Sequence, residues 1–120
     1  MAKHNELGKL GEEMAVKHLA NKGYQILEVN YRFGRDEVDI IVQKDLVIVF
    51  VEVKTRENNY LGEPEEAVSK AKQKRIIKVA NHYMIDNELE LEGRFDIVAI
   101  IINQKTQQIN HIENAFIPSW

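Results

Sequence analysis

The stretch VIVFVEVK at residues 47–54 constrains the fold more than any other part of the chain. Its first half is apolar on both alternating faces, which is typical of a central strand in a sheet that is covered on both sides. The second half breaks the pattern with Glu52 and Lys54, which share one face with their Cβ atoms about 6–7 Å apart. These two residues stand at the carboxyl end of the strand, where open α/β sheets tend to place their chemistry.

The segments on either side of this strand predict a mixed sheet. Residues 37–42 form a second β-branched run, joined to the first by a short polar turn that predicts a hairpin. Residues 24–30 suit an edge strand before it, and residues 94–103 and 107–116 predict two further strands near the end of the chain.

Two helices complete the predicted pattern. The first spans 5–22 and ends at Gly23, with an apolar stripe of Leu7, Leu10, Met14, Ala15 and Leu19. The second begins after the cap residue Ser69 and runs to about Asp86, with a stripe of Ile76, Ile77, Ala80, Tyr83 and Met84. The chain therefore reads as α/β, with a central mixed sheet of about five strands flanked by helices.

Composition narrows the class of protein. A chain of 120 residues with 44% hydrophobic content can close one core, so we expect a single domain over 1–120. There is no cysteine, and no apolar run approaches the ~20 residues of a membrane span. We expect a soluble, cytoplasmic protein with no membrane partner. The net charge of −3 makes general adhesion to polyanions unexpected, so nucleic-acid binding would need a local basic surface.

Asp39 interrupts the apolar run of its strand and is predicted to join Glu52 and Lys54. A hairpin loop of two or four residues places Asp39 on the face of Glu52 and Lys54, whereas an odd loop places it on the other face. Two buried carboxylates and an ammonium need partners or a metal. Mg²⁺ or Mn²⁺ would suit Asp39 and Glu52, and Lys54 would then act on the nucleophile and on the charge that grows at a scissile phosphate.

Glu12 is the fourth candidate. On the first helix it lies in line with Gly8, Ala15 and Leu19, at the flank of the buried stripe. From there it would support the metal shell, directly or through a water. The alternative is an ordinary glutamate on the helix surface.

Glu12 in LGKLGEE, Asp39 in DEVDII and the pair in FVEVK resemble the PD-(D/E)xK nuclease superfamily. From Gly8 to about Phe116, the chain is similar to the YraN-like family UPF0102, which is related to archaeal Holliday-junction resolvases. The resemblance also covers Asn30, Arg32, Lys72-Gln73, RFDIV at 94–98 and NAF at 114–116.

This resemblance implies a restriction-endonuclease-like fold, metal-dependent cleavage of nucleic acid, DNA above all, and a homodimer as a possible assembly. It implies Asp39, Glu52 and Glu12 as metal ligands and Lys54 as their catalytic companion. The chain departs from the family in one place: it has Asp36-Glu37-Val38-Asp39 where the family usually reads GEID. The substitution retains the ligand at Asp39 and adds a charge before the strand.

A basic run opens the second helix, and it predicts contacts with phosphates. The residues expected to bind nucleic acid are Lys70, Lys72, Gln73, Arg75 and, from the resemblance, Arg32. The alternative is a solvated helix face.

Each of the other features also has a structural alternative. Glu52 and Lys54 alone would make an ordinary ion pair at a strand end. Asp96 is expected to pair with Arg94 or to anchor a turn, and His111 and Trp120 are expected to be structural. Tyr31, Phe33 and Tyr60 are expected to pack, with base stacking as the alternative. The sequence leaves three functions open: a nuclease, a non-catalytic nucleic-acid-binding module and a protein-interaction domain.

Overall fold

The structure, a computed structural model, describes residues 2–57 and 68–118, of which 2–5 are described by their backbone alone. Its elements in chain order are α1 (Ala2–Asn21), β1 (Gln25–Phe33), β2 (Asp36–Lys44), β3 (Val47–Arg56), α2 (Lys70–Asp86), β4 (Glu92–Ile102) and β5 (Gln107–Ile112). The five strands form one sheet in the order β1-β2-β3-β4-β5. Only β3 and β4 pair in parallel; the other neighbours are antiparallel. The predicted α/β class, with its mixed five-stranded sheet and flanking helices, is confirmed.

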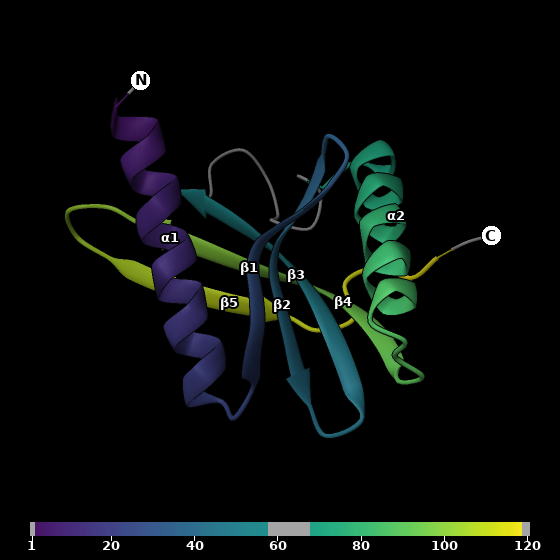
Figure 1. Cartoon of the computed structure of the whole chain (residues 1–120). Coiled ribbons are helices and arrows are strands. Elements are labelled where there is room, and N and C mark those ends of the chain that lie inside the picture. Colours follow the sequence, from purple (N-terminus) through teal and green to yellow (C-terminus); the bar gives the residue numbers. More distant parts are fainter. Residues whose placement is uncertain (1, 58–67, 119–120) are drawn as a thin grey trace.

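The strand β3 lies at the centre of the sheet and is covered on both faces, as its sequence predicts. On one face Val49 and Val51 pack in a core with Leu19 of α1, and on the other Phe50 packs in a core with Ile76 of α2. Figure 1 shows the two helices flanking the strands from opposite sides. None of the described helices is long and apolar enough to cross a membrane.

The buried face of α1 differs from the prediction at one position. Leu10 was expected in the apolar stripe, but its side chain is 42% exposed. The helix instead turns Gly11, Ala15 and Leu19 toward the sheet, at steps of four residues. A Cβ on Gly11 would overlap the side chain of Thr55 on β3, so only glycine permits this close approach.

Local signals set the ends of both helices. Gly23 has φ of +92°, and the next amide, Tyr24 N, donates to Leu19 O at 3.0 Å, which closes α1. At the start of α2, Lys72 N donates to Ser69 Oγ at 3.1 Å, the predicted N-cap. The cap fixes the first turn of α2, which carries Lys72.

The β2–β3 hairpin has a two-residue loop, which is one of the two loop lengths that place Asp39 on the face of Glu52 and Lys54. Lys44 pairs with Val47, and Asp45, in the loop, has φ of +54°. The ladder continues to Ile40 opposite Val51. Continued by one step, the same register sets Asp39 opposite Glu52, on the face that β3 turns toward α2.

Candidate functional site

Asp39 and Glu52 meet where the β2–β3 ladder ends. Asp39 Oδ2 accepts a hydrogen bond from Val53 N at 2.8 Å. Its carboxyl group also hydrogen-bonds the side chain of Glu52. The pair is therefore held by the backbone of two adjacent strands, and the predicted meeting of the two carboxyl groups is observed.

Burial and Glu52 strongly perturb the ionisation of Asp39. Burial, followed by the charge of Glu52 and the hydrogen bond with it, raises the pKa of Asp39 to about 8, although the Val53 N–H opposes the shift. Glu52 itself is only 3% exposed. Asp39 therefore keeps its proton at neutral pH, and the buried Glu52 needs a cationic partner for its charge.

Lys72 is that partner. Its Nζ lies 2.7 Å from Glu52 Oε2, with the side chain of Lys72 36% exposed and that of Glu52 4% exposed. The prediction placed Lys72 on nucleic-acid phosphates; here it reaches from the first turn of α2 to the buried carboxylate instead. The basic helix α2 thus lies beside the acidic pair, as it must if its basic residues are to contact the phosphates of a nucleic acid bound there.

A cleft of about 280 Å³ opens beside the carboxyl pair. Lys54 lines it and is half-buried, so the predicted trio of Asp39, Glu52 and Lys54 borders one cavity. The remaining lining residues are Leu7, Gly8, Glu12, Val53, Thr55 and Lys72. Two basic groups thus border a cleft whose inner wall carries the two carboxyl groups.

A second hollow, of about 210 Å³, adjoins the same pair. It shares Asp39, Glu52 and Lys72 with the cleft and adds Arg35 and Arg75. Lys72 therefore borders both spaces. The start of β2 adds Asp36 and Glu37, so this second hollow has three basic and four acidic residues in its lining.

Glu12 faces the cleft from α1. Burial raises its pKa, a hydrogen bond from Asn30 opposes the rise, and the charges of Glu37 and Glu52 add to it. With its amide nitrogen turned toward them, Asn30 donates to Glu12 Oε1 at 2.9 Å and to Glu37 Oε1 at 3.1 Å. Glu12 is therefore electrostatically part of the site, but its hydrogen bond runs to β1.

The donor set suits a hard divalent cation in part. Asp39 and Glu52 are oxygen donors already in contact, and a divalent charge would neutralise both. Within residues 2–57 and 68–118, however, no three acidic or histidine side chains are arranged to hold an ion. The two strand carboxylates thus fit a metal, while the assignment of Glu12 as a third ligand stays a prediction.

The other residues expected to bind nucleic acid have different surroundings. Gln73 Nε2 donates to Val68 O at 3.1 Å, so its amide holds the start of α2. Arg32 is exposed and pairs with Glu37 at 3.0 Å, and Arg75 Nε lies 3.9 Å from Asp36. Lys70 is exposed at the first residue of α2.

Sequence reasoning missed two residues of the site, Arg35 and Thr55. Arg35 lies in the two-residue turn after Gly34, whose φ is +65°, and this turn brings it to the second hollow. A tight turn next to the strand of Asp39 was the available signal. Thr55 continues the strand beyond Lys54, and nothing in its sequence context marks its contact with Gly11.

The aromatic residues pack, as expected where they are described. Phe33 stacks on His82 with ring centroids 3.8 Å apart, and Tyr31 meets Tyr83 edge-on at 5.0 Å. Tyr60 and Trp120 lie outside the described residues. The two described aromatics of β1 are therefore engaged with α2.

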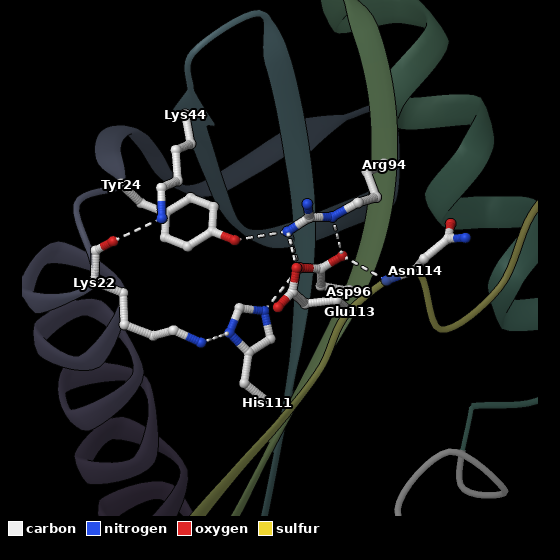
Figure 2. A network of polar contacts seen from close by, with 8 residues as sticks. All are labelled: Lys22, Tyr24, Lys44, Arg94, Asp96, His111, Glu113 and Asn114. Carbon is white, nitrogen blue, oxygen red and sulfur yellow. Dashed lines mark hydrogen bonds and ion pairs between the residues drawn. The ribbon is translucent and has the colours of Figure 1, made fainter.

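A second buried carboxylate, Asp96, lies on β4 and has very different surroundings (Figure 2). Arg94 donates to both of its oxygens, at 2.9 and 2.8 Å, and Asn114 N donates at 3.0 Å. His111 Nε2 lies 2.7 Å from Asp96 Oδ2. Burial alone would raise the pKa of Asp96, but these hydrogen bonds together hold the pKa below its ordinary value. The expected pairing with Arg94 is confirmed, and His111 contacts the same carboxylate.

Residues 11–100 match the model of the family described as "Uncharacterised protein family UPF0102". Relatives carry the same name: the protein from Flavobacterium psychrophilum is 48% identical, with 97% of this chain and 98% of the relative covered. The relative from Christiangramia forsetii is 47% identical over the same shares, and that from Bacteroides thetaiotaomicron is 45% identical over 98% of each chain.

The chain belongs to the UPF0102 family. The matched range of this UPF0102 protein includes Glu12, Asp39, Glu52, Lys54 and Lys72, and so contains every charged residue that lines the cleft. The family assignment and the geometry thus concern the same part of the molecule.

Proposed function

We propose that this UPF0102 protein is a divalent-metal-dependent nuclease that hydrolyses phosphodiester bonds in nucleic acid, with DNA as the substrate. The observation that carries the proposal is the contact between Asp39 and Glu52 on the wall of a cleft that Lys54 also lines. Paired carboxylates can bind a divalent ion, and an adjacent ammonium can stabilise the charge that grows on a phosphate.

Each residue of the site has a distinct role in the proposed reaction. Asp39 and Glu52 would hold Mg²⁺ or Mn²⁺, and Glu12 would add negative charge from α1. When bound, such a cation supplies Lewis acidity to the phosphate and lowers the pKa of water. Lys54 orients the attacking water and stabilises the charge that develops on the phosphate oxygens.

The basic groups around the carboxyl pair would hold the substrate backbone. Lys72 and Arg75 lie on α2, and Arg35 lies on the β1–β2 turn, so cations border the pair from two elements. The overall charge of −3 is compatible with this role because contacts to phosphates depend on the local arrangement of charge.

Cleavage of labelled DNA tests the proposal directly. Branched, flapped, single-stranded and duplex substrates are compared in Mn²⁺ and Mg²⁺ for wild type, Glu52→Gln and Lys54→Met. We expect both variants to lose at least about a hundredfold in rate, because each removes a group that acts on the reacting atoms. Calorimetry should show that Lys54→Met still takes up Mn²⁺ and that Asp39→Asn with Glu52→Gln does not.

A matched control is Glu13→Gln, which removes an exposed carboxylate next to Glu12 that does not line the cleft. This variant should cut at the wild-type rate. Equal residual cutting by wild type and Glu52→Gln would mean that a contaminant is responsible, and the proposal would then be wrong.

A non-catalytic nucleic-acid-binding module is the second candidate. The observation that favours it is that Lys72 neutralises Glu52, so the site is charge-compensated by the chain itself. This candidate predicts that wild type binds DNA equally with and without Mn²⁺ and cuts none of the four substrates.

A further inference from the structure

The ion pair between Lys72 and Glu52 places a cation of the chain where a metal would act. Lys72 Nζ lies 2.7 Å from Glu52 Oε2, which is the distance of a strong charge-assisted hydrogen bond. A divalent ion held by Asp39 and Glu52 would bring two positive charges to this carboxylate. The ammonium and the ion therefore compete for the same oxygen.

The two partners differ in their freedom to move. Glu52 lies on the central strand with its side chain 4% exposed, whereas the side chain of Lys72 is 36% exposed at the start of a helix. A lysine side chain is a flexible stem with a compact charge, so its ammonium can leave without moving the backbone. Lys72 is therefore the partner whose charged group can leave the ion pair.

The surroundings offer a destination for the released ammonium. Lys72 borders both the cleft and the second hollow, and the second hollow is also lined by Arg35 and Arg75, together with the acidic Asp36 and Glu37. Three basic groups from α2 and the β1–β2 turn would converge on one small space beside the reacting phosphate. A phosphate oxygen is the ligand that such a group of cations prefers.

We propose that Lys72 is a displaceable counter-ion: a divalent cation releases it from Glu52, and it then binds a substrate phosphate together with Arg35 and Arg75. This rests on the proposed metal-dependent nuclease function. Lys72 is a positioning residue that couples the two binding events. Uptake of the cation creates the phosphate subsite, and a bound phosphate retains Lys72 and so favours uptake of the cation.

Metal affinity measured without DNA tests the first half of the proposal. Calorimetric titration with Mn²⁺ is compared for wild type, Lys72→Met, Lys72→Arg and Lys74→Met. We expect Lys72→Met to bind Mn²⁺ about tenfold more tightly, because the competing charge is gone while the carboxylates remain. Lys72→Arg, which keeps the charge, should bind close to wild type, and Lys74→Met, on an exposed position of the same helix, should be unchanged.

Affinity for a labelled single-stranded oligonucleotide, measured by fluorescence anisotropy, tests the second half. Ca²⁺, another hard cation with oxygen ligands, replaces Mn²⁺ in these titrations. In wild type, Ca²⁺ should tighten binding several-fold, and Lys72→Met should lose most of that gain.

The outcomes separate this inference from the proposed function. If wild type takes up Mn²⁺ but Lys72→Met binds it equally or more weakly, Lys72 is no competitor and the inference is overturned, while the nuclease proposal stands. If none of the four proteins takes up Mn²⁺, the metal-dependent function fails and the inference fails with it.

Discussion

Two aspartates of this UPF0102 protein, the half-buried Asp39 and the fully buried Asp96, show opposite solutions to the same physical problem. Asp96 is fully buried. Arg94 and the backbone N–H of Asn114 donate hydrogen bonds to its carboxylate, and His111 contacts the same group. Asp39 receives one backbone hydrogen bond and otherwise faces a second carboxyl group. Accordingly, the pKa of Asp96 is lowered and that of Asp39 is raised.

The difference separates a stabilising site from a reactive one. Around Asp96 each charge has a partner, and Arg94 also donates to Tyr24 Oη at 2.6 Å, so the network links β4 to the segment after α1 (Figure 2). Around Asp39, burial and the neighbouring Glu52 keep the carboxyl group protonated at neutral pH, so the folded chain forgoes an ionisation that the unfolded chain gains, which costs stability. Strained electrostatics of this kind in a cleft is typical of a functional site.

The largest expected contrast is in the stability of single variants. Asp96→Ala should lower the free energy of unfolding by about 3–5 kcal/mol, because it leaves Arg94 and the Asn114 N–H without their acceptor. Asp39→Asn should not lower it and should raise it at pH 7, by up to a few kcal/mol, because the unfolded wild type gains free energy by ionising the Asp39 that the folded state keeps protonated. Urea unfolding followed by circular dichroism measures both. Equal losses in the two variants would contradict the distinction.

The sequence predicted the arrangement of the reactive site better than its charge balance. Alternation along 47–54 and a two-residue hairpin loop are local rules, and together they were enough to bring Asp39 to Glu52. The ion pair of Lys72 depends instead on how α2 crosses the sheet, which side-chain periodicity does not specify. Leu10 was misplaced for a related reason: the close contact of Gly11 with Thr55 sets the rotation of α1, and that contact joins residues 44 positions apart.

Less of the stabilising site could be predicted from the sequence. Arg94 and Asp96 share a face of one strand, so their pairing was predictable. His111 and Asn114 come from β5 and the turn after it, and their convergence on Asp96 depends on the β4–β5 register. Long-range convergence of this kind follows from the topology of the whole sheet.

An intermediate effect is expected where α1 packs beside the reactive site. Gly11→Ala should destabilise the protein by about 1–3 kcal/mol, because the new methyl group overlaps the β-branched Thr55 and displaces the helix. The same displacement should move Glu12 away from the cleft and weaken Mn²⁺ binding, while leaving the Asp96 network in place. Calorimetry with Mn²⁺ and urea unfolding report the two effects.

Gly8→Ala is the matched control for this variant. Gly8 lies one turn earlier on the same helix, and a Cβ there would meet no atom within 4 Å. This substitution should be neutral or slightly stabilising, because alanine favours the helix by up to about 1 kcal/mol. A loss as large as that of Gly11→Ala would show that the close approach to Thr55 is not the cause.

The two aspartates should also differ in the pH dependence of stability without metal. Because the folded-state pKa of Asp39 lies near 8, above its ordinary value of 3.8, folding retains a proton that the unfolded chain releases. Its contribution is therefore greatest below about pH 4 and is lost as the pH rises toward 8. The pKa of Asp96 is lowered, so its contribution is present above pH 3.8 and is lost as the pH falls below that value. Urea unfolding from pH 3 to pH 9 in EDTA, for wild type and Asp39→Asn, isolates the first contribution, which should amount to several kcal/mol across that range. If both proteins lose the same stability between pH 4 and pH 8, then Asp39 is not the protonated partner of Glu52, and the two aspartates are electrostatically alike after all.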